Sequence, residues 1–270
     1  MCNKILANYH THTVFCDGKN TPEEVVLAAL EKGFCALGFS GHVTTPYDLT
    51  YCMKDTEGYI QEIVRLKEKY KDKIQIYLGT EEDIYSLIDR KRYDYIIGSM
   101  HYIHKDGKFY SIDSGTEDIN KCYEIFDNDV LKFAEAYFCE FVDYINKRKP
   151  DIVGHFDLIT KYDEQNEPIF LNNEEYFKIA EKYLKIAAGV DTVFEVNTGA
   201  VAKGIRKTPY LGERLLRVLK KADAKIIISS DSHKAETLDF GFEDVKYMLK
   251  DLGFDGTYVL YNGKFQKRAL

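Results

Sequence analysis

Short apolar runs alternate along the chain with longer stretches in which apolar residues recur at helical spacing. Some of the short runs, such as Ile226-Ile227-Ile228, are continuous, which is typical of strands that are covered on both faces. Strands that alternate with helices favour a parallel sheet built from β/α units. The pattern predicts seven strands, over residues 5–9, 36–40, 74–79, 95–99, 152–154, 192–196 and 225–229.

The helices between these strands carry start and stop signals. Thr21 is the predicted N-cap of the first helix, Pro22 occupies its first turn, Glu24 completes a capping box, and Gly33 ends it. Further helices are predicted over residues 59–70, 174–188 and 210–221, and residues 117–147 form one long helix or two. The polar segment 163–173 is predicted to be a surface loop.

The chain contains no repeat, low-complexity tract or linker rich in Pro and Gly, so residues 1–270 are expected to form a single domain. Seven β/α units in this length predict a barrel or an open sheet. In both architectures the functional side chains belong at the carboxyl ends of the strands.

Charge and composition exclude several classes of function. The 37 Lys and Arg against 44 Asp and Glu give a net charge of −7, and no block of basic residues stands out, which disfavours nucleic acid as a partner. No apolar run approaches the roughly 18 residues that a membrane helix needs. Residues 1–8 lack the pattern of a signal peptide, so we expect a cytoplasmic protein without a membrane partner. The six Cys form no C-x-x-C pair and are expected to be reduced.

Histidine and acidic residues follow the predicted strands. The first strand ends in His10-Thr11-His12, and residues two apart on a strand point the same way, so both imidazoles can reach one cation. One such pair is weak evidence, but five further strand ends also carry His, Glu or Asp. Placement of all of them at one rim by chance is improbable. The residues at these ends are His42, Glu81, His101, His155, Asp231 and His233.

This set of side chains predicts a metal centre. Imidazole and carboxylate without thiolate suit Zn, Mn or Fe. The ligands outnumber the four that a single tetrahedral ion takes, which favours two or three divalent ions. Carboxylates would have to bridge cations held so close together, and Glu81 and Asp231 are the candidates.

Seven segments together resemble the PHP (polymerase and histidinol phosphatase) family, and within it the stand-alone histidinol-phosphatases. They occur in the family's order and span nearly the whole chain. The segments are HTHTVFCDG (10–18), GFSGH (38–42), GTEED (79–83), GSMHYI (98–103), GHFDL (154–158), EVNTGA (195–200) and SDSH (230–233).

The resemblance implies a distorted (β/α)7 barrel, similar to a TIM barrel, with a trinuclear metal site at the C-terminal ends of the strands. Position 17 is His in some members and Asp in this chain, a change that can alter the affinity or identity of the third ion. The implied ligands are His10, His12 and Asp231 for the first metal, Glu81 as a bridge from the first to the second, His101 and His155 for the second, and Asp17, His42 and His233 for the third.

The implied activity is hydrolysis of a phosphate monoester, L-histidinol phosphate, to L-histidinol and phosphate in histidine biosynthesis. A hydroxide that bridges two metals would attack phosphorus, with Glu81, Asp231 and His233 as catalytic residues and His233 or metal-bound water protonating the leaving oxygen. Arg206 can pair bidentately with phosphate and resembles the family's phosphate-binding Arg in its loop. Lys203 and Lys161 are further candidates for holding the phosphate.

Several neighbouring residues have a second interpretation. Strand alternation turns Glu82 away from the side on which Glu81 lies, and His104 in a predicted loop is a surface residue. Asp157 either supports His155 or is structural. Tyr47, Tyr102 and Tyr162 either pack in the core or offer rings to the imidazole of the substrate.

Three other functions compete with this hypothesis. A PHP phosphoesterase could act on another small phosphate ester, such as a nucleotide or a polynucleotide end. A degenerate barrel that only binds would have lost ligands, whereas all nine positions are filled here. An amidohydrolase also begins with an HxH strand, but it usually has eight strands and often a carboxylated Lys, and no well-placed Lys ends the middle strands of this chain. The sequence does not indicate an oligomeric state.

Overall fold

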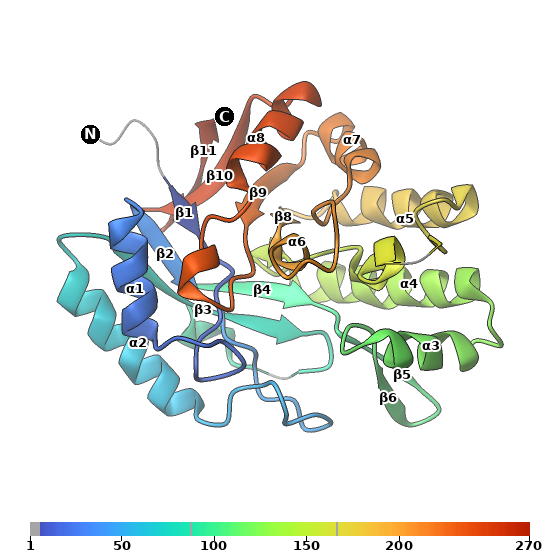
Figure 1. Cartoon of the computed structure of the whole chain (residues 1–270), viewed down its shortest axis with the longest axis horizontal. Coiled ribbons are helices and arrows are strands. Elements are labelled where there is room, and N and C mark those ends of the chain that lie inside the picture. Colours follow the sequence, from blue (N-terminus) through green and yellow to red (C-terminus); the bar gives the residue numbers. More distant parts are fainter. Residues whose placement is uncertain (1–5, 87, 166) are drawn as a thin grey trace.

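A central sheet of seven parallel strands forms the core of the fold (Figure 1). The computed structural model describes residues 6–86, 88–165 and 167–270. The strands follow the order β1-β2-β3-β4-β7-β8-β9, and each pairs in parallel with the next. All seven predicted strands are confirmed, although Ile5 of the first lies outside the described residues. They are β1 (Ala7–Asn8), β2 (Ala36–Phe39), β3 (Gln75–Asp83), β4 (Tyr95–Ser99), β7 (Ile152–Val153), β8 (Val193–Asn197) and β9 (Lys225–Ser229).

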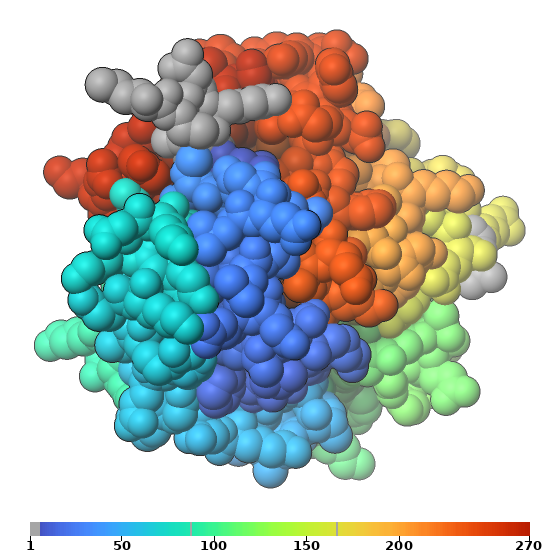
Figure 2. All heavy atoms as spheres, turned by 60° about the vertical axis from the view of Figure 1, so that its left-hand side comes forward, coloured from blue at the N-terminus to red at the C-terminus, as the bar shows by residue number. Residues whose placement is uncertain are grey.

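The sheet curves until its first and last strands meet. A parallel bridge joins Thr11 and Ser232, just beyond the ends of β1 and β9. The His12 N–H donates to the Ser232 carbonyl at 2.8 Å, and the Ser232 N–H donates to the His10 carbonyl at 3.0 Å. In Figure 2 the blue surface of the first elements accordingly borders the orange surface of the last. The sheet is thus a nearly closed barrel rather than an open one, as the (β/α)7 prediction requires.

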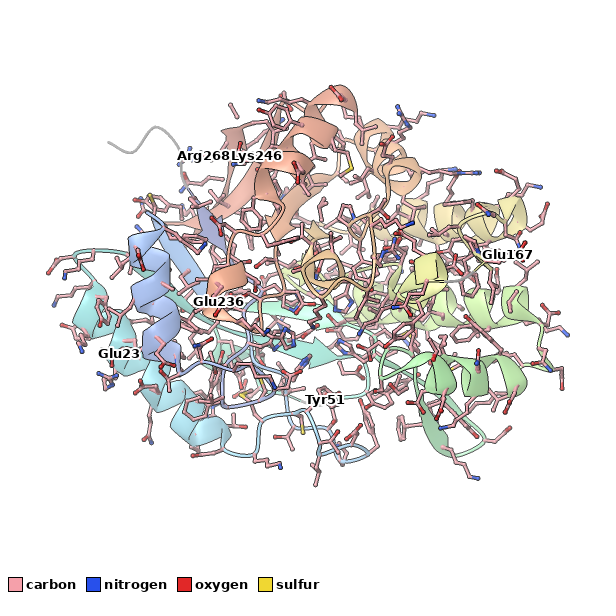
Figure 3. The ribbon with its side chains drawn as sticks, in the orientation of Figure 1. Glu23, Tyr51, Glu167, Glu236, Lys246 and Arg268 are labelled. Carbon is pink, nitrogen blue, oxygen red and sulfur yellow. The ribbon has the colours of Figure 1, made fainter. Side chains whose placement is uncertain are left out.

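Helices surround the barrel and follow most of the predicted ranges. Figure 3 labels Glu23 on the first of them, whose carboxylate accepts hydrogen bonds from Arg65, Lys69 and Tyr70 of the second. The helices are α1 (Pro22–Glu31), α2 (Thr56–Tyr70), α3 (Thr116–Glu124), α4 (Val130–Arg148), α5 (Glu174–Ala187), α6 (Gly199–Ala202), α7 (Glu213–Lys221) and α8 (Phe242–Asp251), with 3₁₀ turns η1 (Arg90–Arg92), η2 (Leu158–Thr160), η3 (Asp163–Gln165) and η4 (Ala235–Thr237).

Local signals explain where these helices begin and end. The capping box of α1 forms as predicted, with Glu24 N–H donating to Thr21 Oγ1 at 3.3 Å and Thr21 N–H to Glu24 Oε2 at 2.8 Å. The 117–147 stretch is two helices, because Asp127 and Asn128 adopt positive φ angles of 58° and 59° between them. The helix predicted from residue 210 starts later because Tyr210 pairs with the end of β8 in an isolated bridge.

The interior of the barrel is packed with aromatic and branched apolar side chains. Tyr9 and Tyr95 are buried there with ring centroids 6.0 Å apart, and the Tyr95 hydroxyl donates to the carbonyl oxygens of Tyr9 and Phe39. Gly79 makes room for the Tyr95 ring, because a Cβ there would lie 2.2 Å from Cζ of that ring. Since the interior is solid core, chemistry is confined to the rim.

Two antiparallel hairpins were not predicted. Strands β10 (Gly256–Tyr261) and β11 (Lys264–Ala269) form one of them. Its Leu260 carbonyl accepts from the Tyr9 hydroxyl at 2.6 Å, and its turn residue Asn262 bonds to Gln75 at the start of β3. This hairpin therefore covers the end of the barrel opposite the carboxyl ends of the strands.

The other hairpin, β5 (Tyr102–Lys105) and β6 (Lys108–Ser111), directly follows β4 on the functional side. Both turns carry a visible signal, Asp106-Gly107 and Asn262-Gly263, in which all four residues have positive φ angles. Among the described residues, no helix is both long and apolar enough to cross a membrane.

Candidate metal centre and active site

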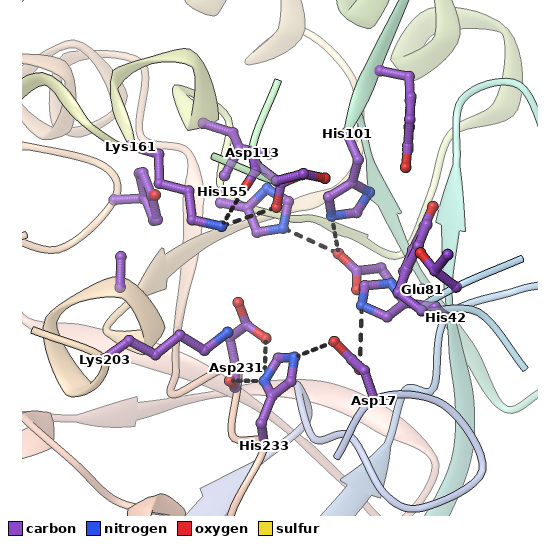
Figure 4. Close-up of a pocket in the computed structure, with 17 residues that line it drawn as sticks. Asp17, His42, Glu81, His101, Asp113, His155, Lys161, Lys203, Asp231 and His233 are labelled. Carbon is purple, nitrogen blue, oxygen red and sulfur yellow. Dashed lines mark hydrogen bonds and ion pairs between the residues drawn. The ribbon is translucent and has the colours of Figure 1, made fainter. Parts of the chain in front are cut away.

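Nine histidine and acidic side chains converge at the carboxyl ends of the strands. They come from the segments after β1, β2, β4, β7 and β9 and from the end of β3 itself, and Figure 4 shows several of them around one cavity. Their ligand atoms form four overlapping sets, and the atoms within each set lie within 4.8 Å of one another. Two of the sets share Glu81 and form one group, so the nine side chains make three groups. The nine are the predicted ligands His10, His12, Asp17, His42, Glu81, His101, His155, Asp231 and His233.

The first group lies where the barrel closes. Nε2 of His10 is 3.2 Å from Oε2 of Glu81 and 3.6 Å from Oδ1 of Asp231. Nε2 of His12 is 3.5 Å and 3.2 Å from the same two oxygens. Four donor atoms from three strand ends therefore surround one point.

Glu81 joins this group to a second one. Its Oε1 lies 3.0 Å from Nε2 of His155 and 3.3 Å from Nε2 of His101. Its Oε2, which faces His10 and His12, is also 2.9 Å from Nδ1 of His42. One buried carboxylate thus presents an oxygen to each of two groups, which is the arrangement that a bridging ligand needs.

A third group forms around Asp17. Oδ2 of Asp17 is 3.1 Å from Nε2 of His233, and Oδ1 is 3.8 Å from Nε2 of His42 and 3.7 Å from Nδ1 of His12. The His12 ring lies between the rings of His42 and His233, with centroids 4.3 Å from each. His12 therefore directs one ring nitrogen to the first group and the other to the third.

The buried donor atoms of these groups fit divalent cations. Nε2 of His10, Nε2 of His12 and Oε2 of Glu81 have no hydrogen-bond partner within the described part of the chain, although they face one another. A buried polar group without a partner costs about 1–3 kcal/mol. A cation at that point satisfies all three atoms, and imidazole with carboxylate is a donor set that Zn, Mn and Fe accept. Oδ1 of Asp17 in the third group also lacks a hydrogen-bond partner within the described part of the chain.

The charges of the groups favour ligation. Burial raises the pKa of the Glu81 and Asp231 carboxyls, but His10 and the other neighbouring cations outweigh it and hold both pKa values well below the usual range. Burial, together with the nearby His233 and His42, lowers the pKa of His12 to about 3. At neutral pH the two acids are therefore ionised and His12 is neutral, with a free lone pair on one of its ring nitrogens, as a metal ligand requires.

Two acidic residues that were not assigned from the sequence contact the metal-ligand residues and fix their positions. Glu195 in β8 has Oε1 2.7 Å from Nδ1 of His10, and its Oε2 accepts the backbone N–H of His155 at 3.0 Å. Asp83 accepts the backbone N–H of His101 at 2.9 Å, and its Oδ2 lies 3.3 Å from Nδ1 of the same residue. A visible signal for Glu195 is its charge in the middle of the apolar strand VFEVN.

A cavity of about 220 Å³ opens beside the three groups. Lys161 and Lys203 line it opposite His42 and Glu81 (Figure 4). Lys161 donates to both the carbonyl and the carboxylate of Asp113, at 2.9 and 3.0 Å. Asp113 was also missed from the sequence, since it follows the unpredicted β5–β6 hairpin. The rings of Tyr51, Tyr102 and Tyr210 complete much of the wall.

Arg206 does not line this cavity, in contrast to its predicted contact with phosphate. Its side chain is 0% exposed. The guanidinium donates to Thr160 and Thr208 and pairs with Glu164, so its donors are used within the protein. The two lysines are the predicted phosphate-binding residues that the fold brings to the cavity.

The remaining neighbours lie outside the ligand groups. Glu82 points away from Glu81 as alternation predicts and forms a two-pronged pair with Arg148 at 2.8 and 2.7 Å. His104 is exposed, on β5 rather than in a loop. Asp157 is buried beside Arg206 rather than among the ligands: burial raises its pKa, and the charge of Arg206 opposes the rise. Tyr102 lines the cavity, whereas Tyr47 and Tyr162 do not.

Comparison with known proteins identifies the family to which this arrangement belongs. A PHP domain matches residues 8–199, which is most of the chain. This chain belongs to the PHP domain family. The family prediction made from the seven motifs is thereby confirmed.

Relatives of similar length extend the comparison. The chain is 27% identical to a "Probable histidinol-phosphatase" of Schizosaccharomyces pombe, over 94% of this chain and 89% of the relative. It is 26% identical to the "Histidinol-phosphatase" of Lactococcus lactis, over 92% and 91%. The crystal structure of histidinol phosphate phosphatase from Lactococcus lactis, complexed with Zn, L-histidinol and phosphate, superposes with a TM-score of 0.75. At 22% identity over 97% of this chain and 98% of that one, it shows that the two share a fold.

Proposed function

We propose that this protein is a metal-dependent phosphomonoesterase that hydrolyses L-histidinol phosphate to L-histidinol and phosphate. The observation that carries the proposal is the convergence of buried, unpartnered ligand atoms beside a cavity that two lysines enter. The names of the relatives in Schizosaccharomyces pombe and Lactococcus lactis support the choice of substrate. The Zn in the Lactococcus lactis structure supports the choice of cofactor.

The three groups of donor atoms would hold two to three divalent ions. We assign His10, His12 and Asp231 to one ion, Glu81 to a bridge, and His101 with His155 to the next; Asp17, His42 and His233 are the ligands for a third. When bound, the ions supply a water of lowered pKa as nucleophile and screen the negative charge on the phosphoryl oxygens. Zn, Mn and Fe all fit the donor set.

The residues of the chain bind and orient the substrate. Lys161 and Lys203 supply positive charge for the phosphoryl oxygens that face away from the ions. Burial lowers the pKa of Lys161, but Asp113 and the neighbouring Tyr162 and Asp231 together outweigh it, so the pKa is raised and the ammonium is kept at neutral pH. His233 lines the cavity with a side chain that is 15% exposed. It can donate a proton to the leaving oxygen only where it does not bind the third ion, and a water held by the ions is the donor otherwise.

The same cavity offers a surface for the rest of the substrate. Tyr51 and Tyr102 present aromatic rings, and Asp113 presents a carboxylate. Burial raises the pKa of Asp113, but Lys161 and His101 outweigh it and the pKa falls to about 2. Asp113 is therefore negatively charged at neutral pH. An ammonium and an imidazole are groups that such a surface binds well.

The test is release of inorganic phosphate by purified, metal-loaded protein. L-histidinol phosphate is compared with nucleoside monophosphates, which represent the alternative that the enzyme acts on another small phosphate ester. We expect a kcat/KM for L-histidinol phosphate at least about 10²-fold higher, since a site built around polar groups discriminates strongly against a substrate that leaves them unpaired. Similar values for both substrates would contradict the assignment.

A further inference from the structure

A buried arginine joins the two segments that carry the lysines of the cavity. Nη1 of Arg206 donates to the Thr160 carbonyl at 2.9 Å and also contacts the Thr160 hydroxyl. Nε donates to the Thr208 carbonyl at 3.0 Å, and Nη2 donates to the Thr208 hydroxyl at 3.2 Å. Thr160 lies on the segment after β7, whereas Arg206 and Thr208 lie on the segment after β8. One guanidinium therefore links the two segments.

Each of these segments brings one lysine to the cavity. Lys161 follows Thr160 directly, and Lys203 precedes Arg206 by three residues. Thr160 is fixed in turn, because it is 0% exposed and its hydroxyl donates to the Asp157 carbonyl at 2.8 Å. The backbone N–H of Arg206 donates to the Ala200 carbonyl at 3.2 Å, which holds the turn around Lys203. Arg206 thus connects the segment that carries Lys161 with the turn that carries Lys203.

Glu164 and Tyr210 extend the link on both sides. Oε1 of Glu164 lies 3.5 Å from Nη2 of Arg206. The same carboxylate accepts hydrogen bonds from the Thr208 hydroxyl and from the backbone N–H of Lys207. Cζ of Arg206 lies 4.6 Å from the centroid of the Tyr210 ring, which lines the cavity and stands edge-on to the His155 ring at 6.1 Å. The guanidinium is therefore enclosed by acceptors and a ring, and the cavity does not expose it.

We propose that Arg206 is a positioning residue, which sets the spacing of Lys161 and Lys203 for an anionic phosphoryl group without touching that group. This inference rests on the proposed function only in taking phosphate as the anion. Arginine suits the role because its planar fork can donate to several acceptors in fixed directions at once, whereas a lysine ammonium cannot span Thr160 and Thr208 together.

The test measures the affinity of the metal-loaded protein for inorganic phosphate by calorimetry, without any turnover. Arg206→Lys keeps the positive charge but removes the planar guanidinium group. We expect it to weaken phosphate binding by about tenfold in the natural chain but by less than about twofold when Lys161→Met and Lys203→Met are also present, since two changes that act through one element are not additive. The bound ions keep phosphate binding measurable in that background.

Two results would overturn the proposal. An equal loss of phosphate affinity in both backgrounds would mean that Arg206 acts on the anion directly or through the stability of the whole fold. An unchanged phosphate affinity in the natural chain would mean that Arg206 does not determine the spacing of the two lysines. Arg214→Lys is the matched control, because Arg214 also pairs with two glutamates and packs on the ring of Phe177 but lies outside the cavity. Its phosphate affinity should stay unchanged.

A second variant covers the case in which Arg206→Lys does not fold. Thr160→Val removes the hydroxyl that contacts Arg206 and keeps the shape of the side chain. It should give the same dependence on the two lysines with a smaller loss, and an unchanged phosphate affinity would count against the link. The outcome is independent of the substrate assignment: a protein that binds phosphate as expected but does not hydrolyse L-histidinol phosphate refutes the proposed function and leaves the role of Arg206 standing.

Discussion

Oε1 of Glu195 lies 2.7 Å from Nδ1 of His10, and both side chains are wholly buried. The carboxylate is placed to accept a proton from Nδ1, so Nε2, which faces Glu81 and Asp231, is the nitrogen that His10 offers to a cation. Oε2 of Glu195 accepts the backbone N–H of His155. One glutamate in β8 thus orients a residue of the first group and anchors a residue of the second.

Replacing this glutamate should weaken metal binding. Glu195→Gln keeps the shape but loses the charge that orients His10, and the loss of such a supporting carboxylate typically costs about 10–100-fold in metal affinity. Competition with a chromogenic chelator measures the change without turnover. Glu82→Gln is the matched control, because Glu82 is equally buried and adjoins Glu81 but pairs with Arg148. Affinities for both variants equal to that of the natural protein would refute the role of Glu195.

Removing a ligand should abolish hydrolysis. Glu81→Gln and His101→Ala each take away donors that the geometry places within 3.3 Å of one another, and we expect kcat/KM to fall by more than about 10²-fold, a larger loss than for a supporting residue. Circular dichroism should show an intact fold. His104→Ala, which changes an exposed histidine outside the groups, should retain full activity. Hydrolysis that survives in both ligand variants would rule out the metal-dependent reaction.

Chelation should destabilise the protein as well as inactivate it. Without a cation between them, the buried polar atoms of His10, His12 and Glu81 have no partner, and this lowers the free energy of unfolding. A ligand that binds only the folded state adds about 2.7 kcal/mol when it is present at 100 times its dissociation constant. We therefore expect EDTA to lower the melting temperature and Zn, Mn or Fe to restore it.

Elemental analysis of the purified protein provides an independent check on the metals. The three groups of donor atoms predict two to three transition ions per chain. A melting temperature that EDTA leaves unchanged, together with the absence of such ions, would remove the basis for a metal centre.

Much of the architecture was predictable because buried parallel strands appear in the sequence as short, continuous apolar runs. Apolar runs mark the barrel strands, and the predicted ligands other than Asp17 follow such a run or end it, so locating the strands located these residues. Asp17 was expected only from the resemblance to the family. His10 and His233 illustrate the gain: they are far apart in the sequence, yet the Thr11–Ser232 bridge brings their neighbourhoods together. What placed them at one rim was the topology of parallel β/α units.

The parts that were missed or misplaced depend on details that the pattern does not carry. Asp113 follows a hairpin whose Asp-Gly turn was overlooked. Glu195 lies within an apolar strand, where a charged residue is unexpected. Arg206 was expected to reach phosphate, since the sequence shows the residue type but not the direction in which its loop turns. The structure turns it toward Thr160, behind the cavity.

The packing of the barrel interior leads to a prediction about stability. A Cβ at position 79 would lie 2.2 Å from Cζ of Tyr95, whose ring is fixed by its hydroxyl contacts with Tyr9 and Phe39. Gly79→Ala should therefore lower the free energy of unfolding by about 1–3 kcal/mol, the usual cost of overpacking. Urea denaturation measures this change.

The same substitution made in a Tyr95→Leu background tests the cause. The smaller side chain frees the space that the ring occupies, so Gly79→Ala should cost clearly less there, and the difference is the coupling between the two positions. Gly212→Ser is the control, because a Cβ at Gly212 meets open space and serine is favoured at the helix N-cap that Gly212 occupies; its effect should stay within about 0.5 kcal/mol. An equal cost of Gly79→Ala in both backgrounds would show that the Tyr95 ring does not select glycine at position 79.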